Sequence, residues 1–126
     1  MRVTFLRLAT VMTTATALVL TAIPVVAAPP CTWTGRWETN WGRMDLQQSG
    51  DQVTGTYVRQ SGKMVGRVTG NVLSGTWTEG PTYRPPTDAG DYEFVMAPGC
   101  NAFNGRWRYT GKSDWRPWTG KRAGTR

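Results

Sequence analysis

Few residues in this chain could carry out covalent chemistry. The 126 residues contain no histidine and two cysteines. Without histidine the chain cannot form a Ser-His or Cys-His nucleophilic pair or a histidine-based metal site. A glycosidase needs two carboxyl groups facing one cleft, whereas Glu79 is the one carboxylate on an inward position of the strands predicted below. We therefore expect no catalytic residue, no metal site, no cofactor and no enzymatic activity.

A combination of large rings and inward-facing charges points instead to ligand binding. Aromatic walls with a few convergent polar groups are typical of small-molecule sites. A charge on an inward position is costly unless it is paired, bound to a ligand or placed at a wet barrel mouth. Two simpler interpretations stay open: the rings only fill a core, and Arg59 and Glu79 extend into solvent at the rim. The candidate ligand-binding residues are Trp37, Tyr57, Arg59, Trp77, Glu79, Trp107 and Arg122.

A repeated phrase in the sequence positions these residues. It consists of a small polar residue, a glycine, any residue and then usually an aromatic residue, and four copies end at Trp37, Tyr57, Trp77 and Trp107. The copies at 65–68 and 119–122 lack the aromatic end. On a strand, the glycine and the large residue face the same side. A ring from a neighbouring strand can then lie across the glycine, which suits a tightly curved sheet.

Strand and turn signals alternate at short, regular spacing along the chain, as is typical of an all-β barrel or sandwich. A period of two separates an apolar face from a polar face, and eight strands is the number at which a barrel interior fills with side chains or holds one small ligand. We therefore predict an all-β, eight-stranded antiparallel up-and-down (meander) barrel. The predicted strands are residues 33–39, 41–48, 53–59, 64–69, 72–79, 91–97, 102–109 and 117–122.

The first 28 residues are predicted to be a secretory signal peptide. Arg2 and Arg7 give a positive start, residues 8–26 are apolar, and small residues follow at a plausible cleavage point. The apolar run is also long enough for a membrane anchor, which is the alternative. Residues 29–126 then form a single secreted domain, extracellular or periplasmic, without stable membrane insertion after cleavage. Loss of the two arginines lowers the formal net charge from +7 to about +5.

The two cysteines predict one disulfide. Cys31 and Cys100 are the only two cysteines of a chain that is predicted to be exported, and disulfides persist in oxidising compartments. The bond would tie the first strand to the region before the seventh. By the chain-entropy model it would stabilise the fold by roughly 3–4 kcal/mol.

Short motifs in the strands resemble the calycin group, which includes the lipocalins and avidins. Gly35-Arg36-Trp37 is similar to the group's Gly-x-Trp signature. Residues 34–37 followed by 53–57 resemble the opening hairpin of avidins, and 104–107 resemble a later avidin strand. The resemblance implies that a basic residue of the last strand, here Arg122, packs over Trp37. The pattern departs from avidins at the biotin-binding positions, where this chain carries Thr39, Arg43 and Arg59. It therefore implies the barrel without the biotin-binding pattern.

A second candidate surface lies on the outer face. The predicted meander brings together a basic patch, and positive charge favours anionic partners. Exposed aromatic residues near loops, Trp41, Tyr83, Trp115 and Trp118, could stack on sugar rings. An ordinary solvated face is the simpler interpretation of the same charges. The patch residues are Arg36, Arg106, Arg108 and Lys121.

Two functions follow from these candidates. The leading one is a secreted, non-catalytic binding protein that holds a small apolar or aromatic ligand at the mouth of a tryptophan-lined barrel. The alternative is an interaction module that binds an anionic polysaccharide, such as a cell-wall polymer, or a protein partner, including as an inhibitor. That module would use the basic patch and the loop aromatics. Nucleic acid is not an expected partner of an exported protein, and the sequence makes no prediction of oligomeric state.

Overall fold

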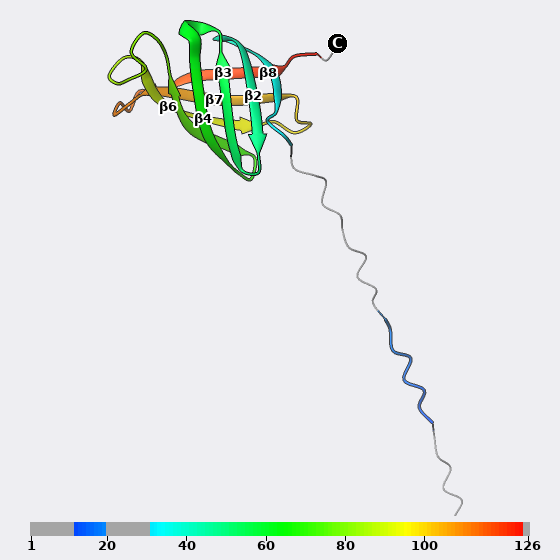
Figure 1. Cartoon of the computed structure of the whole chain (residues 1–126). Helices are drawn as coiled ribbons and strands as arrows, with labels where there is room; N and C mark the ends of the chain where they lie inside the picture. Colours follow the sequence, from blue (N-terminus) through cyan, green and yellow to red (C-terminus); the bar gives the residue numbers. More distant parts are fainter. Residues whose placement is uncertain (1–11, 20–30, 125–126) are drawn as a thin grey trace, which may run out of the picture.

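The computed structural model describes residues 12–19 and 31–124, and the second range contains eight strands (Figure 1). Every predicted strand is present, and no strand end differs from its predicted position by more than two residues. The predicted signal peptide and its cleavage point lie largely outside the described residues. The strands are β1 (Gly35–Thr39), β2 (Gly42–Ser49), β3 (Gln52–Tyr57), β4 (Gly62–Thr69), β5 (Val72–Thr78), β6 (Ala89–Met96), β7 (Ala102–Tyr109) and β8 (Arg116–Arg122).

The strands form one closed barrel in chain order. Each strand pairs antiparallel with the next, and β8 pairs with β1 to close the sheet. This is the all-β, up-and-down architecture predicted from the sequence. In the described part of the chain, no helix is both long and apolar enough to pass through a membrane.

One strand prediction needs correction. Strand β3 ends at Tyr57, not at residue 59, and a short 3-10 turn, η1 (Arg59–Ser61), leads into β4. Gln60 and Ser61 have φ angles of +48° and +50°, which a continuing strand cannot adopt. Arg59 therefore belongs to the turn and not to β3, so the alternation that predicts an inward side chain does not apply to it.

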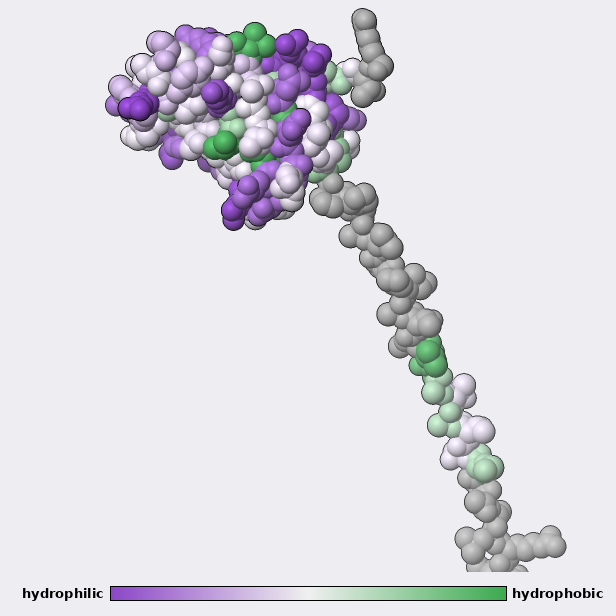
Figure 2. Space-filling model, viewed as in Figure 1, coloured by the Kyte–Doolittle hydropathy of each residue, from purple (hydrophilic) through white to green (hydrophobic). Residues whose placement is uncertain are grey.

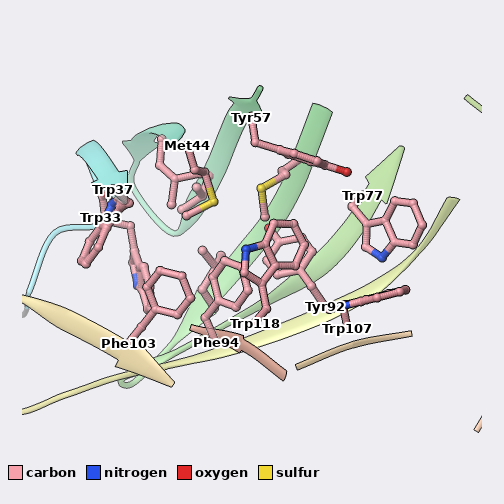
Figure 3. Close-up of a cluster of buried hydrophobic side chains, with 14 of the residues drawn as sticks. Trp33, Trp37, Met44, Tyr57, Trp77, Tyr92, Phe94, Phe103, Trp107 and Trp118 are labelled. Atoms are coloured by element: carbon pink, nitrogen blue, oxygen red, sulfur yellow. Dashed lines mark hydrogen bonds between the residues drawn. The ribbon is translucent and has the colours of Figure 1, made fainter. Parts of the chain in front are cut away.

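The predicted inner face is the buried face. Large apolar residues from all eight strands form a single core, and Phe94 and Phe103 stack at its centre with ring centroids 4.2 Å apart. Figure 3 shows Trp33 and Trp37 at one end of this cluster and Trp77 and Trp107 at the other. Most of the barrel interior is therefore filled by the protein's own side chains.

Rings lie over glycines across neighbouring strands, as the repeated phrase predicts. In each case the ring and the glycine are direct cross-strand partners, so the ring occupies the space that a side chain would need. This allows large rings to share the narrow interior of an eight-stranded barrel. The pairs are Tyr57–Gly62, Trp77–Gly90, Phe94–Gly105 and Phe103–Gly120.

The end of the barrel near Trp37, called the closed end below, is sealed. Trp33 is almost fully buried there, and its carbonyl oxygen accepts a hydrogen bond of 3.0 Å from Trp37 Nε1. The Arg122 guanidinium lies 4.2 Å from the centre of the Trp37 ring, which is the contact that the calycin resemblance implies. Burial lowers the pKa of this guanidinium.

The predicted disulfide is also at the closed end. Cys31 and Cys100 are bonded, with their Cα atoms 5.4 Å apart. Arg122 Nε donates to the Cys100 carbonyl, so the disulfide and the Arg122 contact brace the same region. A disulfide in a β-barrel is consistent with an extracellular or periplasmic location.

Replacing a crowded glycine should destabilise the barrel. In Gly105→Ala the new Cβ would meet the Phe94 ring and lie 2.7–2.8 Å from the Glu93 and Trp118 carbonyl oxygens. We expect a loss of about 1–3 kcal/mol in the free energy of unfolding, measured by urea denaturation. Gly124→Ala is the matched control, because nothing lies within 4 Å of its Cβ. Equal unfolding midpoints for the two variants would contradict the prediction.

Candidate functional site

The end of the barrel opposite the closed end holds a small pocket, called the cup below. In an antiparallel meander the ends of β1, β3, β5 and β7 meet the starts of the even strands at one rim. The residues that line the pocket come from these strand ends and their connections. They are Trp41, Tyr57, Arg59, Trp77, Glu79, Trp107, Tyr109, Arg116 and Trp118.

The structure brings five of the seven predicted ligand-binding residues together in the cup. Trp37 and Arg122 are the two that it does not include. Both lie at the closed end, where Trp37 has no exposed surface and Arg122 covers its ring. The included residues are Tyr57, Arg59, Trp77, Glu79 and Trp107.

Four cup residues are not among the predicted ligand-binding residues. Two of them, Trp41 and Trp118, are instead predicted as exposed loop aromatics, and for Trp118 that expectation is wrong because it is 3 % exposed and belongs to the core. Alternation along the predicted strands 102–109 and 117–122 places Tyr109 on the same side as Trp107, and Trp118 on the same side as Gly120, so their position in the strand was an available signal. Trp41 is the first residue of the predicted strand 41–48, but it lies in the turn between β1 and β2, where alternation along a strand does not apply. That turn is fixed against β8 because Asn40 Nδ2 donates to the Pro117 carbonyl and Asn40 Oδ1 accepts from the Thr119 amide. Arg116 begins β8 and had no distinguishing signal.

The walls of the cup are six aromatic rings in mostly edge-to-face contact. Trp107 is the hub, with ring centroids 5.5 Å from Trp41, 5.7 Å from Trp77 and 5.2 Å from Tyr109. Tyr57 and Trp118 meet at 5.2 Å. Edge-to-face pairs of this kind hold each ring's orientation, so the walls are preformed.

A buried carboxylate lies among these rings. Glu79 follows β5 and is 9 % exposed, and the Tyr57 hydroxyl donates a 2.7 Å hydrogen bond to its Oε1 atom. Arg59 Nε lies 3.9 Å from the same oxygen. No described residue donates a hydrogen bond to Oε2. The Glu79 amide donates to the Asp88 carbonyl, which fixes the backbone that carries the carboxylate.

Burial raises the pKa of the Tyr57 phenol, and the hydrogen bond to Glu79 and its negative charge raise it further. The nearby Arg59 guanidinium acts in the opposite direction. The phenol therefore stays protonated and remains a hydrogen-bond donor to the carboxylate throughout the physiological range.

Two arginines lie at the mouth of the cup over ring faces. The Arg59 guanidinium is 4.8 Å from the centre of the Trp41 ring, and Arg116 is 5.3 Å from that of Trp107. Both side chains are about half exposed. Arg116 also lies 3.5 Å from Asp114, so its charge is partly compensated outside the cup.

The cup has a volume of about 110 Å³. Pockets for drug-sized ligands are usually about 300–1,000 Å³, whereas a cavity of about 150 Å³ suffices for benzene. The cup in this conformation is therefore nearer in size to a cavity for a single ring than to a pocket for a drug-sized ligand. A long lipid or a large cofactor would not fit within it.

The basic residues of the outer wall do not gather in one place. Arg106 and Arg108 lie toward the cup, with both guanidinium groups against the Trp115 ring, whereas Arg36 and Lys121 lie toward the closed end. Three of the four form ion pairs, and Lys121 is the cross-strand neighbour of Glu38. The face shown in Figure 2 is mostly hydrophilic. The ion pairs are Arg36–Asp45 (3.2 Å), Arg106–Glu93 (3.4 Å) and Arg108–Asp91 (2.9 Å).

Within residues 12–19 and 31–124, no three His, Cys, Asp or Glu side chains are grouped so that they could hold a metal ion. Comparisons with protein families, with curated proteins and with solved structures found no match for this chain. The function must therefore be argued from the cup itself.

The buried phenols should make the stability of the barrel fall at high pH. Burial raises the pKa of Tyr92 as well as that of Tyr57, so the folded state keeps two protons that the unfolded chain releases above about pH 10. The free energy of unfolding should therefore decrease as pH rises from 10 to 11.5, measured by urea denaturation. Each phenol contributes a slope of up to about 1.4 kcal/mol per pH unit.

The matching variant is Tyr57→Phe, which removes one of these protons. Its slope should be shallower than that of the unmodified protein, and Tyr92→Phe should have a similar effect. A Tyr57→Phe slope equal to that of the unmodified protein would show that Tyr57 ionises as readily in the folded state as in the unfolded chain.

Proposed function

We propose that this protein is a secreted, non-catalytic binding protein that holds a small ligand with an apolar or aromatic surface in the cup. The observation that carries the proposal is the contrast between the two ends of the barrel. The closed end is sealed by Trp33 and the Arg122–Trp37 contact, whereas the other end is an open cup with six aromatic walls. Preformed aromatic walls around a few polar groups are typical of small-molecule sites.

We further propose that the barrel is of the calycin type, like those of lipocalins and avidins. The closed eight-stranded meander and the Arg122 guanidinium packed over Trp37 support this assignment. The cup then lies at the mouth of the barrel, where a single-ring ligand could enter without disturbing the stacked core below it.

The alternative, a polyanion-binding outer wall, receives less support. Three arginines of the proposed patch are paired with carboxylates on neighbouring strands, and the four basic residues divide between the two ends. An anionic polymer would have to compete with these carboxylates for each arginine. The charge pattern therefore favours an ordinary solvated wall.

The seven tryptophans offer a direct test, because each indole gives its own Nε1–H signal in NMR spectra. Phenol, used as a single-ring probe, should shift the signals of the four tryptophans in the cup. The other three signals should stay in place. The cup tryptophans are Trp41, Trp77, Trp107 and Trp118, and the others are Trp33, Trp37 and Trp115.

A matched pair of variants gives the control. Trp41 lies in a rim turn, so Trp41→Ala should leave the fold intact and weaken phenol binding by at least about tenfold. Trp115→Ala removes the same side chain from the outer wall and should leave binding unchanged. If phenol shifts the Trp115 signal instead, or binds equally well to both variants, the cup is not the binding site.

A further inference from the structure

We propose that the ligand group held in the cup is a methylated ammonium, such as the trimethylammonium group of choline, with its charge balanced by Glu79. This inference rests on the proposed function, because it names the chemical class that the same cup would bind. Three features of the cup carry it: the ring faces, the position of the fixed charge and the shortage of hydrogen-bond acceptors.

The ring faces already attract cations. The faces of Trp, Tyr and Phe rings carry negative electrostatic potential, and cations within about 6 Å of a ring centre are attracted to them. In this protein the Arg59 and Arg116 guanidinium groups occupy such positions over Trp41 and Trp107 at the mouth. The deeper walls present further rings, which a cation that is free of the protein chain could contact from several sides.

The charge that is fixed inside the cup is negative. The Glu79 side chain is 11 % exposed, whereas the Arg59 and Arg116 side chains are 50 % and 52 % exposed. Water and salt weaken interactions with the two arginines, which can also turn away into solvent. The buried carboxylate is held by the Tyr57 hydrogen bond and by its own backbone contacts. A ligand inside the cup therefore meets Glu79 as its principal charge.

The shortage of acceptors favours a methylated ammonium over other cations. A primary ammonium has three N–H donors and a guanidinium has five, and each donor needs an acceptor when it leaves water. Around the cup, Glu79 Oε1 already accepts from Tyr57, which leaves Oε2 as the accessible carboxylate acceptor. A trimethylammonium group has no N–H donor, and its methyl surface matches the ring walls. It is also comparable in size to the single ring that the cup fits.

Arg59 would then compete with the ligand. Its guanidinium lies beside Glu79 and over Trp41, in the place that an incoming cation would approach. It is carried by η1, whose Gln60 and Ser61 have positive φ angles, so the turn is not part of the regular strand ladder. Removing the Arg59 charge should therefore strengthen the binding of a cation and weaken the binding of an anion.

The decisive experiment compares choline with 3,3-dimethylbutan-1-ol, its neutral carbon counterpart of nearly the same shape. Affinities are measured by calorimetry, and the tryptophan Nε1–H signals report where each probe binds. Choline should bind at least about tenfold more tightly than the neutral alcohol. Glu79→Gln, which keeps an oxygen for the Tyr57 hydrogen bond, should remove most of this difference and leave only the part due to the ring faces. Arg59→Gln should tighten choline binding about threefold or more.

Glu93→Gln is the matched control, because Glu93 is paired with Arg106 on the outer wall. It should leave the preference for choline unchanged. Arg59 is half exposed, so Arg59→Gln should fold normally even if Glu79→Gln does not. The comparison of the two probes on the unmodified protein needs no variant at all.

The possible results separate this inference from the function on which it rests. If 3,3-dimethylbutan-1-ol or phenol binds in the cup as tightly as choline, the cation preference is wrong and the cup still binds small apolar ligands. If benzoate binds most tightly and Arg59→Gln weakens it, the ligand is an anion and the inference is overturned. If none of the four probes shifts a cup tryptophan, both the inference and the proposed function fail.

Discussion

The contact between an aromatic ring and a glycine on the next strand is the interaction on which this barrel depends. An eight-stranded barrel has a narrow interior, and rings of this size could not share it if every inward position carried a side chain. Opposite each of four rings the partner strand has a glycine, whose side chain is a single hydrogen atom. Because the glycine has no larger side chain, the two backbones can also approach each other and the sheet can bend. Curvature and core packing are thus one property of the sequence.

This arrangement also explains why the cup lies where it does. The middle of the barrel is filled by stacked rings such as Phe94 and Phe103, and Trp33 adds a ring from outside the sheet at the closed end. At the opposite rim no described segment covers the interior in the same way. The rings there contact each other by their edges and leave a hollow of single-ring size. A hydrogen-bonded carboxylate is stable in that hollow because Tyr57 satisfies one of its oxygens.

The sequence was sufficient to predict the architecture but only part of the site. The alternation of residues along a strand identifies which face a side chain occupies, so the strands and the inner rings were predictable. The single disulfide was predictable because the chain has two cysteines. Period does not identify the height of a side chain along the barrel axis, which depends on strand stagger. Trp37 and Arg122 have the right phase but lie at the wrong end, and the outer arginines divide for the same reason. Trp41 is the first residue of the predicted strand 41–48 but lies in a turn, so alternation along the strand could not identify it as a wall.

The positions at which the chain enters and leaves the barrel have a practical consequence. Cys31 is tied to Cys100, and the Ala123 amide bonds to the Arg36 carbonyl, so both exits lie at the closed end (Figure 1). A domain tethered through either terminus would therefore present its mouth away from the support. The barrel could be fixed to a sensor chip, or displayed on a cell, by a linker at either end while its opening stays free to sample the medium.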